Sequence, residues 1–419
     1  MIKVLWITNI MFPEAVSILT GQGELKASGG WMLGAANALL RSDEVQLTVA
    51  SVSPLVQQLT FVKGEKINYY ALPLGKGNTR INPDYEPLWK QVKKEVEPDV
   101  VHIHGTEFSH GYAYVRACGA DNVVVSIQGL VSAYCYYYYY YGISVSSILK
   151  NITYNDLRSK TIFQGKKDFQ IRGEYEKDLI RSCKHIIGRT SWDRARTWAI
   201  NPAAEYHFCN ETLRDEFYDG SKWKYDNCIP HSIFLSQATY PIKGLHQVLK
   251  AMPMILRHFP DTQIRIAGSN ITKGRKRLFI SGLSGYGKII KSLIDEYGLS
   301  DHITFTGNLN AEQMKQEYLH SNVFICPSTI ENSPNSLGEA QVLGVPHLCS
   351  YVGGAMDMMK GNEECLYRFE EIESLAYKVC AIFDSGAKQN DMSQVALKRH
   401  DPETNQKQVL NIYTNIVKA

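Results

Sequence analysis

The sequence predicts an α/β fold with two successive, similar domains. With 419 residues, the chain is longer than the ~250–300 residues at which a single hydrophobic core usually stops growing. Short apolar strands alternate with helical segments, a pattern typical of a parallel sheet that helices cover on both faces. This alternation begins at Val4 and restarts after Pro230. We therefore expect one domain over residues 1–226 and a second over residues 227–400.

The expected elements of the first half follow from apolar runs that glycine, proline or asparagine interrupts. The first strand ends at Asn9 and Pro13, and Pro98 precedes the third strand. The expected strands are Val4–Thr8, Val45–Ser51, Val100–Ile103, Asn122–Ile127 and Lys184–Arg189. The expected helices are Trp31–Leu40 and Lys90–Val96.

The second half repeats this pattern. Gly268 ends one expected strand, and Gly344 with Pro346 beyond it ends a helix. The expected strands are Ser232–Gln237, Gln263–Ala267, Ile303–Thr306, Val323–Cys326 and Val345–Cys349. The expected helices are Leu245–Arg257, Ile289–Tyr297, Ala311–Leu319 and Glu403–Val417.

Composition excludes several classes of protein. A net charge of +3 and the lack of any zinc-finger or RNA-binding motif argue against nucleic acid as a partner. The nine cysteines are dispersed without a Cys-x-x-Cys motif, which indicates reduced thiols. We find no signal-peptide pattern and no apolar run of the ~18–20 residues that a membrane span needs. We therefore expect a cytoplasmic protein.

Glu331 and Glu339 bracket the loop and helix start that follow the strand Val323–Cys326. Ligands of parallel α/β sheets bind at the carboxyl ends of strands, and a helix N-terminus attracts phosphate. Small polar residues, including Asn335 and Ser336, stand at that helix start. A phosphate bound there would leave one glutamate on each side to accept hydrogen bonds from sugar hydroxyls, which indicates a nucleotide sugar. Alternatively, the glutamates share this spacing by chance and the polar residues only cap the helix.

Two further loops carry groups suited to a diphosphate. Lys243, with Gly244 behind it, precedes the first helix of the second half, where a cation can neutralise phosphate charge. Gly29 and Gly30 lie between the first strand and the first helix and allow close backbone approach to a phosphate or sugar. Alternatively, Lys243 is only an exposed surface lysine, and Gly29 with Gly30 forms an ordinary turn.

His102 and His104 lie two residues apart near the carboxyl end of a strand. Such a pair could bind a metal, but no third ligand stands nearby in the sequence, so we expect none. Structural histidines are commoner than catalytic ones. His104 is the better functional candidate because it is nearer the end of the strand.

A tyrosine-rich segment contains Tyr134 and Tyr136–Tyr141, and Lys and Arg residues follow between residues 150 and 177. It is either a partly buried aromatic segment, a wall of an acceptor site, or a surface that enters lipid headgroups, because tyrosine combines an apolar ring with a polar tip.

Several of these motifs together resemble the retaining glycosyltransferases with the GT-B fold, the large group 1 family that holds glycogen-synthase-like and mannosyltransferase-like enzymes. The resemblance is carried by Asp99–His104, Lys243-Gly244, Glu331–Glu339 and Val352-Gly353-Gly354. It implies two Rossmann-like domains that face each other across a cleft, with the acceptor in the first and the nucleotide sugar in the second. It also implies that the final helix, within residues 401–419, packs back on the first domain.

By this resemblance, Lys243 would bind the diphosphate, Glu339 the ribose and Glu331 the transferred sugar, without a metal. The expected catalytic residues are Glu331, His104 and Gln128. The expected donor-binding residues are Lys243, Gly244, Glu339, Asn335, Ser336, Leu337, Gly29, Gly30 and Gly268. The expected acceptor-binding residues are Tyr134 and Tyr136.

The sequence departs from the family pattern in two places. The arginine that commonly precedes the lysine is absent from residues 235–239, so the diphosphate has less compensating charge unless Arg275 or Lys276 replaces it. Gln128 stands where many members have a histidine, and glutamine can hydrogen-bond a sugar but cannot act as a general base.

We expect a metal-independent retaining hexosyltransferase that uses a UDP- or GDP-linked sugar and no other cofactor. The expected acceptor is a glycan or a lipid-linked glycan in cell-surface polysaccharide or glycolipid assembly, with peripheral contact at the inner face of the membrane. The alternatives are a sugar-nucleotide epimerase on the same fold and a non-catalytic nucleotide-sugar-binding subunit.

Overall fold

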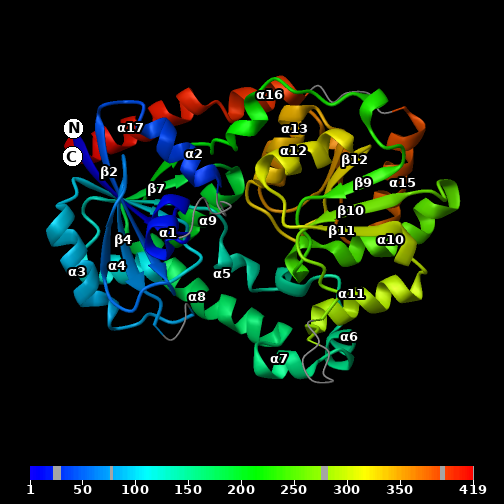
Figure 1. The fold of residues 1–419 in the computed structure, drawn as a ribbon, viewed down its shortest axis with the longest axis horizontal. Coiled ribbons are helices and arrows are strands. Elements are labelled where there is room, and N and C mark those ends of the chain that lie inside the picture. Colours follow the sequence, from blue (N-terminus) through cyan, green and yellow to red (C-terminus); the bar gives the residue numbers. More distant parts are fainter. Residues whose placement is uncertain (22–29, 76–78, 275–281, 387–391, 419) are drawn as a thin grey trace. The chain divides into compact units, whose positions relative to one another are not determined.

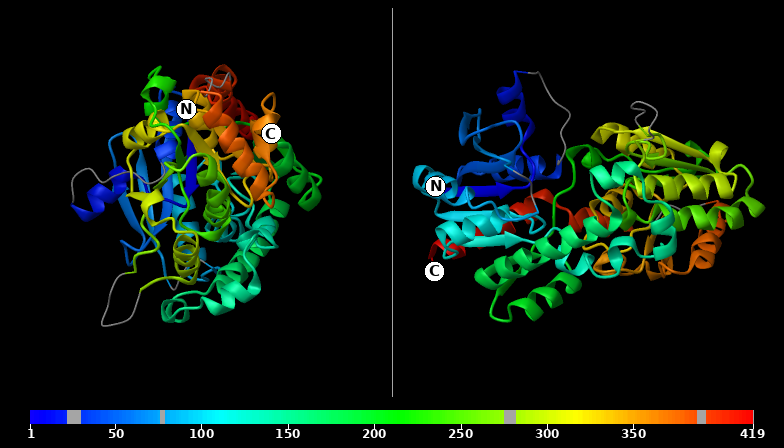
Figure 2. Two further views of the ribbon diagram at one scale, coloured as in Figure 1. Left: turned by 90° about the vertical axis from the view of Figure 1, so that its right-hand side faces the viewer. Right: turned by 90° about the horizontal axis from the view of Figure 1, so that it is seen from below.

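The computed structural model describes residues 1–21, 30–75, 79–274, 282–386 and 392–418 (Figure 1). The chain forms two compact units, each built around one sheet. Unit 1 comprises Met1–Ala133, Asp168–Arg214 and His400–Ala419, and unit 2 comprises Tyr134–Lys167 and Asp215–Arg399. Both ends of the chain belong to unit 1 (Figure 2).

Unit 1 contains an eight-stranded sheet in the order β3-β4-β2-β1-β5-β6-β7-β8. Only the pairing of β3 with β4 is antiparallel. The strands are β1 Ile2–Thr8, β2 Val45–Ser53, β3 Thr60–Lys63, β4 Asn68–Pro73, β5 Val100–His104, β6 Val123–Ser126, β7 His185–Gly188 and β8 Glu205–Phe208. The helices that begin in this unit are α1 Pro13–Thr20, α2 Gly30–Leu39, α3 Tyr85–Val96, α4 His110–Cys118, α5 Val131–Tyr134, α9 Ser191–Ile200 and α17 Pro402–Lys418.

The C-terminal helix α17 packs on unit 1 beside α2, as the family resemblance implied (Figure 1). A buried hydrogen-bond network fixes it there. Trp6 Nε1 donates to the Tyr413 hydroxyl at 2.9 Å, and that hydroxyl lies 2.6 Å from His102 Nδ1. The other ring nitrogen of His102 lies 2.6 Å from Ser126 Oγ. Both nitrogens of His102 are thus bonded inside the core, so His102 is a structural residue.

Unit 2 contains a fully parallel six-stranded sheet in the order β11-β10-β9-β12-β13-β14. The strands are β9 Ser232–Leu235, β10 Gln263–Ala267, β11 Ile303–Gly307, β12 Val323–Cys326, β13 His347–Ser350 and β14 Leu366–Tyr367. The helices are α6 Val145–Lys150, α7 Tyr154–Arg158, α10 Leu245–His258, α11 Gly285–Glu296, α12 Ala311–His320, α13 Asn335–Leu343, α14 Ala355–Met358, α15 Ile372–Asp384 and α16 Met392–Arg399. Helix α8, Ile162–Ser182, begins in unit 2 and continues into unit 1.

Side-chain alternation along β9 explains why both faces of this sheet are covered. Ile233 and Leu235 pack with α10, α11 and α15 on one face, whereas Phe234 packs with α12 and α13 on the other. All three side chains are fully buried. An apolar residue at every position of a short strand is the pattern from which the sequence predicts a doubly covered parallel sheet.

The units differ from the expected domains in two segments, 134–167 and 215–226, both of which belong to unit 2. Residues 134–167, which the sequence placed in the first domain, belong to unit 2. Asp156 accepts from the Gly285 amide at 2.8 Å, and Thr153 Oγ1 donates to the Leu283 carbonyl at 2.8 Å, which attaches α7 to the start of α11. No local pattern in the sequence could reveal these contacts, because they join residues about 130 positions apart.

Candidate functional site

The strand order of unit 2 identifies the place where a ligand is expected. From β9 the chain continues to β10 and β11 on one side, and it then returns to β12 on the other side of β9. The switch in direction therefore falls between β9 and β12, and ligands of open α/β sheets bind outside the carboxyl ends of strands at such a point. The loop after β9 carries Lys243, and the loop after β12 carries Glu331.

Lys243 and Glu331 meet at this switch point. Lys243 Nζ lies 2.5 Å from Glu331 Oε1, and Ser328 Oγ donates to the same carboxylate oxygen at 2.7 Å. The two charged side chains are only 19% and 12% exposed. Burial alone would lower the pKa of Lys243, but the charge of Glu331 beside it holds that pKa well above the usual lysine value. Lys243 is therefore a fixed cation at neutral pH.

Two glycines allow the loops to approach so closely. Gly244 has a φ of +71°, and a Cβ added there would lie 1.7 Å from the Pro327 carbonyl oxygen. Gly353 has a φ of +53°, and its Cβ would lie 1.9 Å from the Glu331 carbonyl oxygen. Both are left-handed conformations in which a side chain would also clash with backbone. The role of Gly244 here is therefore to bring Lys243 against the β12 loop.

Helix α13 begins directly after the Glu331 loop. Its N-cap residue, Pro334, has no side-chain oxygen, and no acidic residue stands in the first turn. The positive end of the helix dipole is therefore not neutralised by its own side chains. Asn335 and Ser336 form the start of the helix.

The inner residues of α13 are anchored in the core. The Leu337 amide donates to the Pro334 carbonyl at 2.9 Å and its side chain is fully buried, so Leu337 contributes packing at this helix start. Glu339 is 5% exposed and accepts from the Tyr318 hydroxyl at 3.3 Å. The same hydroxyl lies 3.0 Å from the Ser336 carbonyl oxygen, so its one proton is shared between the two acceptors. Tyr318 thus links Glu339 to the first turn of the helix.

The other expected donor-binding residues have different positions. Gly268 follows β10 with a φ of +110°, and its amide donates to the Gly307 carbonyl at 2.9 Å. Gly30 is the first residue of α2. Gly29 lies outside the described residues, as do Arg275 and Lys276, the candidates for the missing arginine.

In unit 1, His104 and Gln128 line one cavity at the carboxyl ends of the strands. Arg189 and Glu211, which form an ion pair, line the same cavity. Burial lowers the pKa of His104 well below its usual value, so its ring is neutral at neutral pH. The ring stacks on His102, with centroids 3.8 Å apart. Neutral hydrogen-bonding side chains of this kind suit a sugar hydroxyl.

Glu107, which the sequence analysis missed, lies at the same end of the unit 1 sheet. Asn9 Nδ2 donates to Glu107 Oε2 at 3.1 Å, and the Gly129 amide donates to Oε1 at 3.2 Å. Burial raises the pKa of Glu107 above its usual value. Its position three residues beyond His104, in the loop after β5, is the sequence signal that could have identified it.

The two expected acceptor residues lie in the tyrosine-rich segment. Tyr134 is half-buried at the end of α5, and Tyr136 is 51% exposed. The backbone around them is held by unit 2: Thr329 Oγ1 donates to the Tyr138 carbonyl at 2.6 Å, and His246 Nε2 lies 2.9 Å from the Tyr141 carbonyl. Thr329 lies two residues before Glu331, so this segment is next to the site in unit 2.

The geometry of unit 2 suits an anionic, hydroxyl-bearing ligand. It combines a buried lysine, a helix N-terminus without a side-chain cap, and carboxylates at positions 331 and 339. Phosphate oxygens interact with the first two groups, and hydroxyls donate to carboxylates. Among the described residues, no helix is both long and apolar enough to cross a bilayer.

Comparison with known proteins gives a family for the part of the chain that carries this site. Residues 230–399 match the model of glycosyl transferases group 1. An uncharacterized glycosyltransferase of Methanocaldococcus jannaschii is 24% identical over 187 residues, which cover 43% of this chain and 44% of that protein. The chain spans less than half the length of the curated relatives that it matches.

Solved structures match the fold over nearly the whole chain. Sucrose-phosphate synthase from Thermosynechococcus elongatus has a TM-score of 0.69 at 15% identity, with 99% of this chain and 98% of that chain covered. HepE of Anabaena, solved in complex with UDP-glucose, has a TM-score of 0.63 at 14% identity, with 99% and 100% covered. The fold is therefore the two-domain α/β arrangement called GT-B.

Proposed function

We propose that this chain is a group 1 glycosyltransferase, because residues 230–399 match the model of that family. It would move a hexose-type sugar from a nucleotide diphosphate sugar to a hydroxyl acceptor. The donor would be UDP- or GDP-linked, and the anomeric configuration would be retained. One observation carries the proposal: Lys243 and Glu331 pair at the switch point of the unit 2 sheet, beside the start of α13. This is the place at which an open α/β sheet binds its ligand.

Charge at this place supports a reaction without a metal. The diphosphate leaves with additional negative charge, which Lys243 and the N-terminus of α13 can stabilise. Because the pKa of Lys243 is raised, the lysine remains charged throughout the neutral range. The leaving phosphate would then take the acceptor proton in a front-side displacement, since Gln128 cannot act as a general base.

The carboxylates would hold the two polyol groups of the donor. Glu339, linked through Tyr318 to the first turn of α13, is proposed to accept hydrogen bonds from the ribose. Glu331 would bind the transferred sugar through the carboxylate lone pairs that Lys243 and Ser328 do not occupy. His104 and Gln128, which line the unit 1 cavity, would contact the acceptor.

Two other functions predict different products. A sugar-nucleotide epimerase would convert the donor when no acceptor is present, whereas the proposed transferase would need the acceptor. A non-catalytic subunit would bind the nucleotide sugar and convert nothing. Incubation of the purified protein with each nucleotide sugar, with and without a glycan acceptor, followed by product analysis, separates the three.

The donor base is testable by thermal shift. We expect one of UDP, GDP or ADP, alone or as its sugar, to raise the melting temperature, because a ligand that binds only the native state stabilises it by about 2.7 kcal/mol at a hundredfold excess over Kd. Melting curves with all three nucleotides and their sugars check this. If none raised the melting temperature, donor binding by this chain would be refuted.

We further propose that the acceptor is a lipid-linked glycan at a membrane surface. Segment 134–167 exposes six large apolar or aromatic side chains, each at least 51% exposed: Tyr136, Tyr137, Val145, Leu149, Tyr154 and Leu157. The basic residues Lys150, Arg158, Lys160 and Lys167 are exposed in the same segment. Apolar side chains among basic ones favour the interface of an anionic bilayer.

Vesicle binding tests this surface. Replacing both Leu149 and Leu157 by Ser is expected to weaken sedimentation with anionic vesicles at low salt by about tenfold or more, because each buried leucine contributes about 1.5–3 kcal/mol. Exposed Val395, on α16, provides the matched control as Val395→Ser. If the unaltered protein remained in the supernatant, the membrane contact would be excluded.

A further inference from the structure

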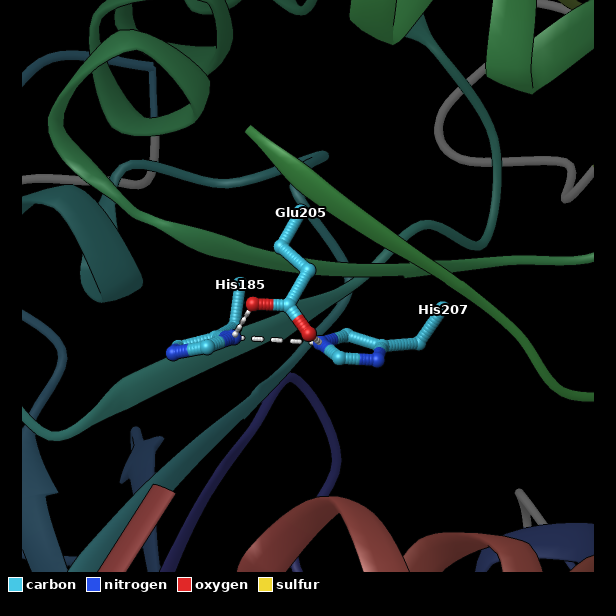
Figure 3. Close-up of side chains that lie close together, drawn as sticks. All are labelled: His185, Glu205 and His207. Carbon is cyan, nitrogen blue, oxygen red and sulfur yellow. Dashed lines mark hydrogen bonds and ion pairs between the residues drawn. The ribbon is translucent and has the colours of Figure 1, made fainter. Parts of the chain in front are cut away.

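Three potential metal ligands meet at the edge of the unit 1 sheet. The parallel register of β7 and β8 places His185 opposite Glu205 and Ile187 opposite His207. Residues two apart on a strand point to the same face, so Glu205 and His207 share the face of β8 that His185 occupies on β7. Figure 3 shows the three side chains directed towards one another.

The distances between these groups resemble those around a tetrahedral metal ion. His185 Nδ1 and His207 Nε2 are 3.1 Å apart. Oε2 of Glu205 lies 3.6 Å from the first nitrogen, and Oε1 lies 3.8 Å from the second. Bonds of about 2.0–2.1 Å to a tetrahedral Zn²⁺ place neighbouring ligand atoms about 3.3–3.4 Å apart. Each separation is therefore within about half an ångström of the value for a bound ion.

The surroundings of the cluster favour binding of a cation. His185 is buried and His207 is partly buried. Without an ion, the facing nitrogens can satisfy each other only if one donates and the other accepts. The Glu205 side chain is 54% exposed, which gives an ion access from solvent and supplies a negative charge.

We propose that His185, Glu205 and His207 form a binding site for a divalent transition metal such as Zn²⁺. Two imidazoles and one carboxylate suit zinc rather than magnesium or calcium, which prefer all-oxygen ligands. The ion would join β8, the edge strand, to β7. His185 and Glu205 are the first residues of β7 and β8, away from the carboxyl ends of the strands where His104 and Gln128 line the cavity, so the ion would be structural and would leave the proposed transfer reaction metal-independent.

Zinc titration tests the site. Chelator-treated protein, titrated with Zn²⁺ by calorimetry, is expected to bind one ion per chain and to melt at a higher temperature with zinc. His207→Gln and Glu205→Gln should each weaken binding at least about 100-fold, because loss of even a supporting partner of a metal ligand costs 10–100-fold. His258→Gln, at an exposed histidine of α10, should bind like the unaltered chain.

A spectroscopic measurement separates a coordinated ion from loose association. Co²⁺ in the unaltered protein should give the intense visible absorption of a tetrahedral site, and His207→Gln should abolish it. Glu205 is half-exposed, so Glu205→Gln should fold normally and report on coordination alone. Absence of zinc binding by the unaltered chain, or undiminished binding by both variants, would overturn the proposal.

Discussion

Lys243→Met is expected to lower kcat/KM for the donor sugar about 10²–10³-fold, the cost of removing one preorganised group that stabilises developing charge. The methionine has a similar length but cannot compensate the diphosphate. Because Lys243 interacts with the nucleotide part of the donor, the same change should also abolish the thermal shift caused by the nucleotide diphosphate alone. Steady-state kinetics and melting curves with and without nucleotide measure both effects.

The pH dependence of donor binding provides a second check on the role of Lys243. A raised lysine pKa means that the charged form is present at every pH below the usual lysine value of about 10.4 and is lost only above it. Titration of Lys243 should therefore cause no loss of donor binding by the unaltered protein between pH 6 and 9. Lys315→Met is the matched control, because Lys315 is also a buried lysine, ion-paired with Asp219 in unit 2. A similar loss of nucleotide binding in Lys315→Met would show that the effect comes from general destabilisation.

Glu331→Gln is expected to reduce transfer about 10²-fold or more while nucleotide binding persists, because a preorganised group that interacts with the reacting sugar is weakened. Glutamine has nearly the same shape but carries no negative charge to pair with Lys243. Release of the lysine from its carboxylate partner should leave affinity for the free nucleotide diphosphate equal or greater. Kinetics and calorimetric titration with the free nucleotide and with the nucleotide sugar distinguish these two effects.

Stability must be separated from function in both variants, because each substitution leaves the other, mostly buried charged residue of the pair without its ionic partner. The double variant Lys243→Met/Glu331→Gln removes both charges, so it should recover part of the stability lost in the single variants. Its transfer activity should remain as low as that of Lys243→Met. Glu317→Gln, which disrupts the Arg265 ion pair of unit 2, is the control for Glu331. Full activity in Glu331→Gln would contradict the assigned role.

Much of the fold followed from sequence because the central strands are short and mostly apolar. The strands β1, β5, β10 and β12 lie where such runs predicted them. The hairpin β3–β4 and the edge strand β8 were missed. In β8 no residue is fully buried, so its sequence Glu205–Phe208 lacks the apolar pattern of a covered strand.

The site residues, too, could be predicted from the sequence only in part. The sequence placed Lys243 and Glu331 on separate loops after strands, and the structure brings their side chains together. Leu337 was expected at the donor, but periodicity alone could not show that its side chain fills the core. The cluster of His185, Glu205 and His207 depends on the pairing of β7 with β8, which no local pattern specifies.

The attachment of residues 134–167 to unit 2 has a consequence for how such proteins can recombine. The chain passes between the units after residues 133, 167, 214 and 399. A chimera joined at a single point near residue 226 would place one parent's α6 and α7 against the other parent's α11. Swapping sugar-donor preference between relatives therefore requires that residues 134–167 be exchanged together with residues 215–399.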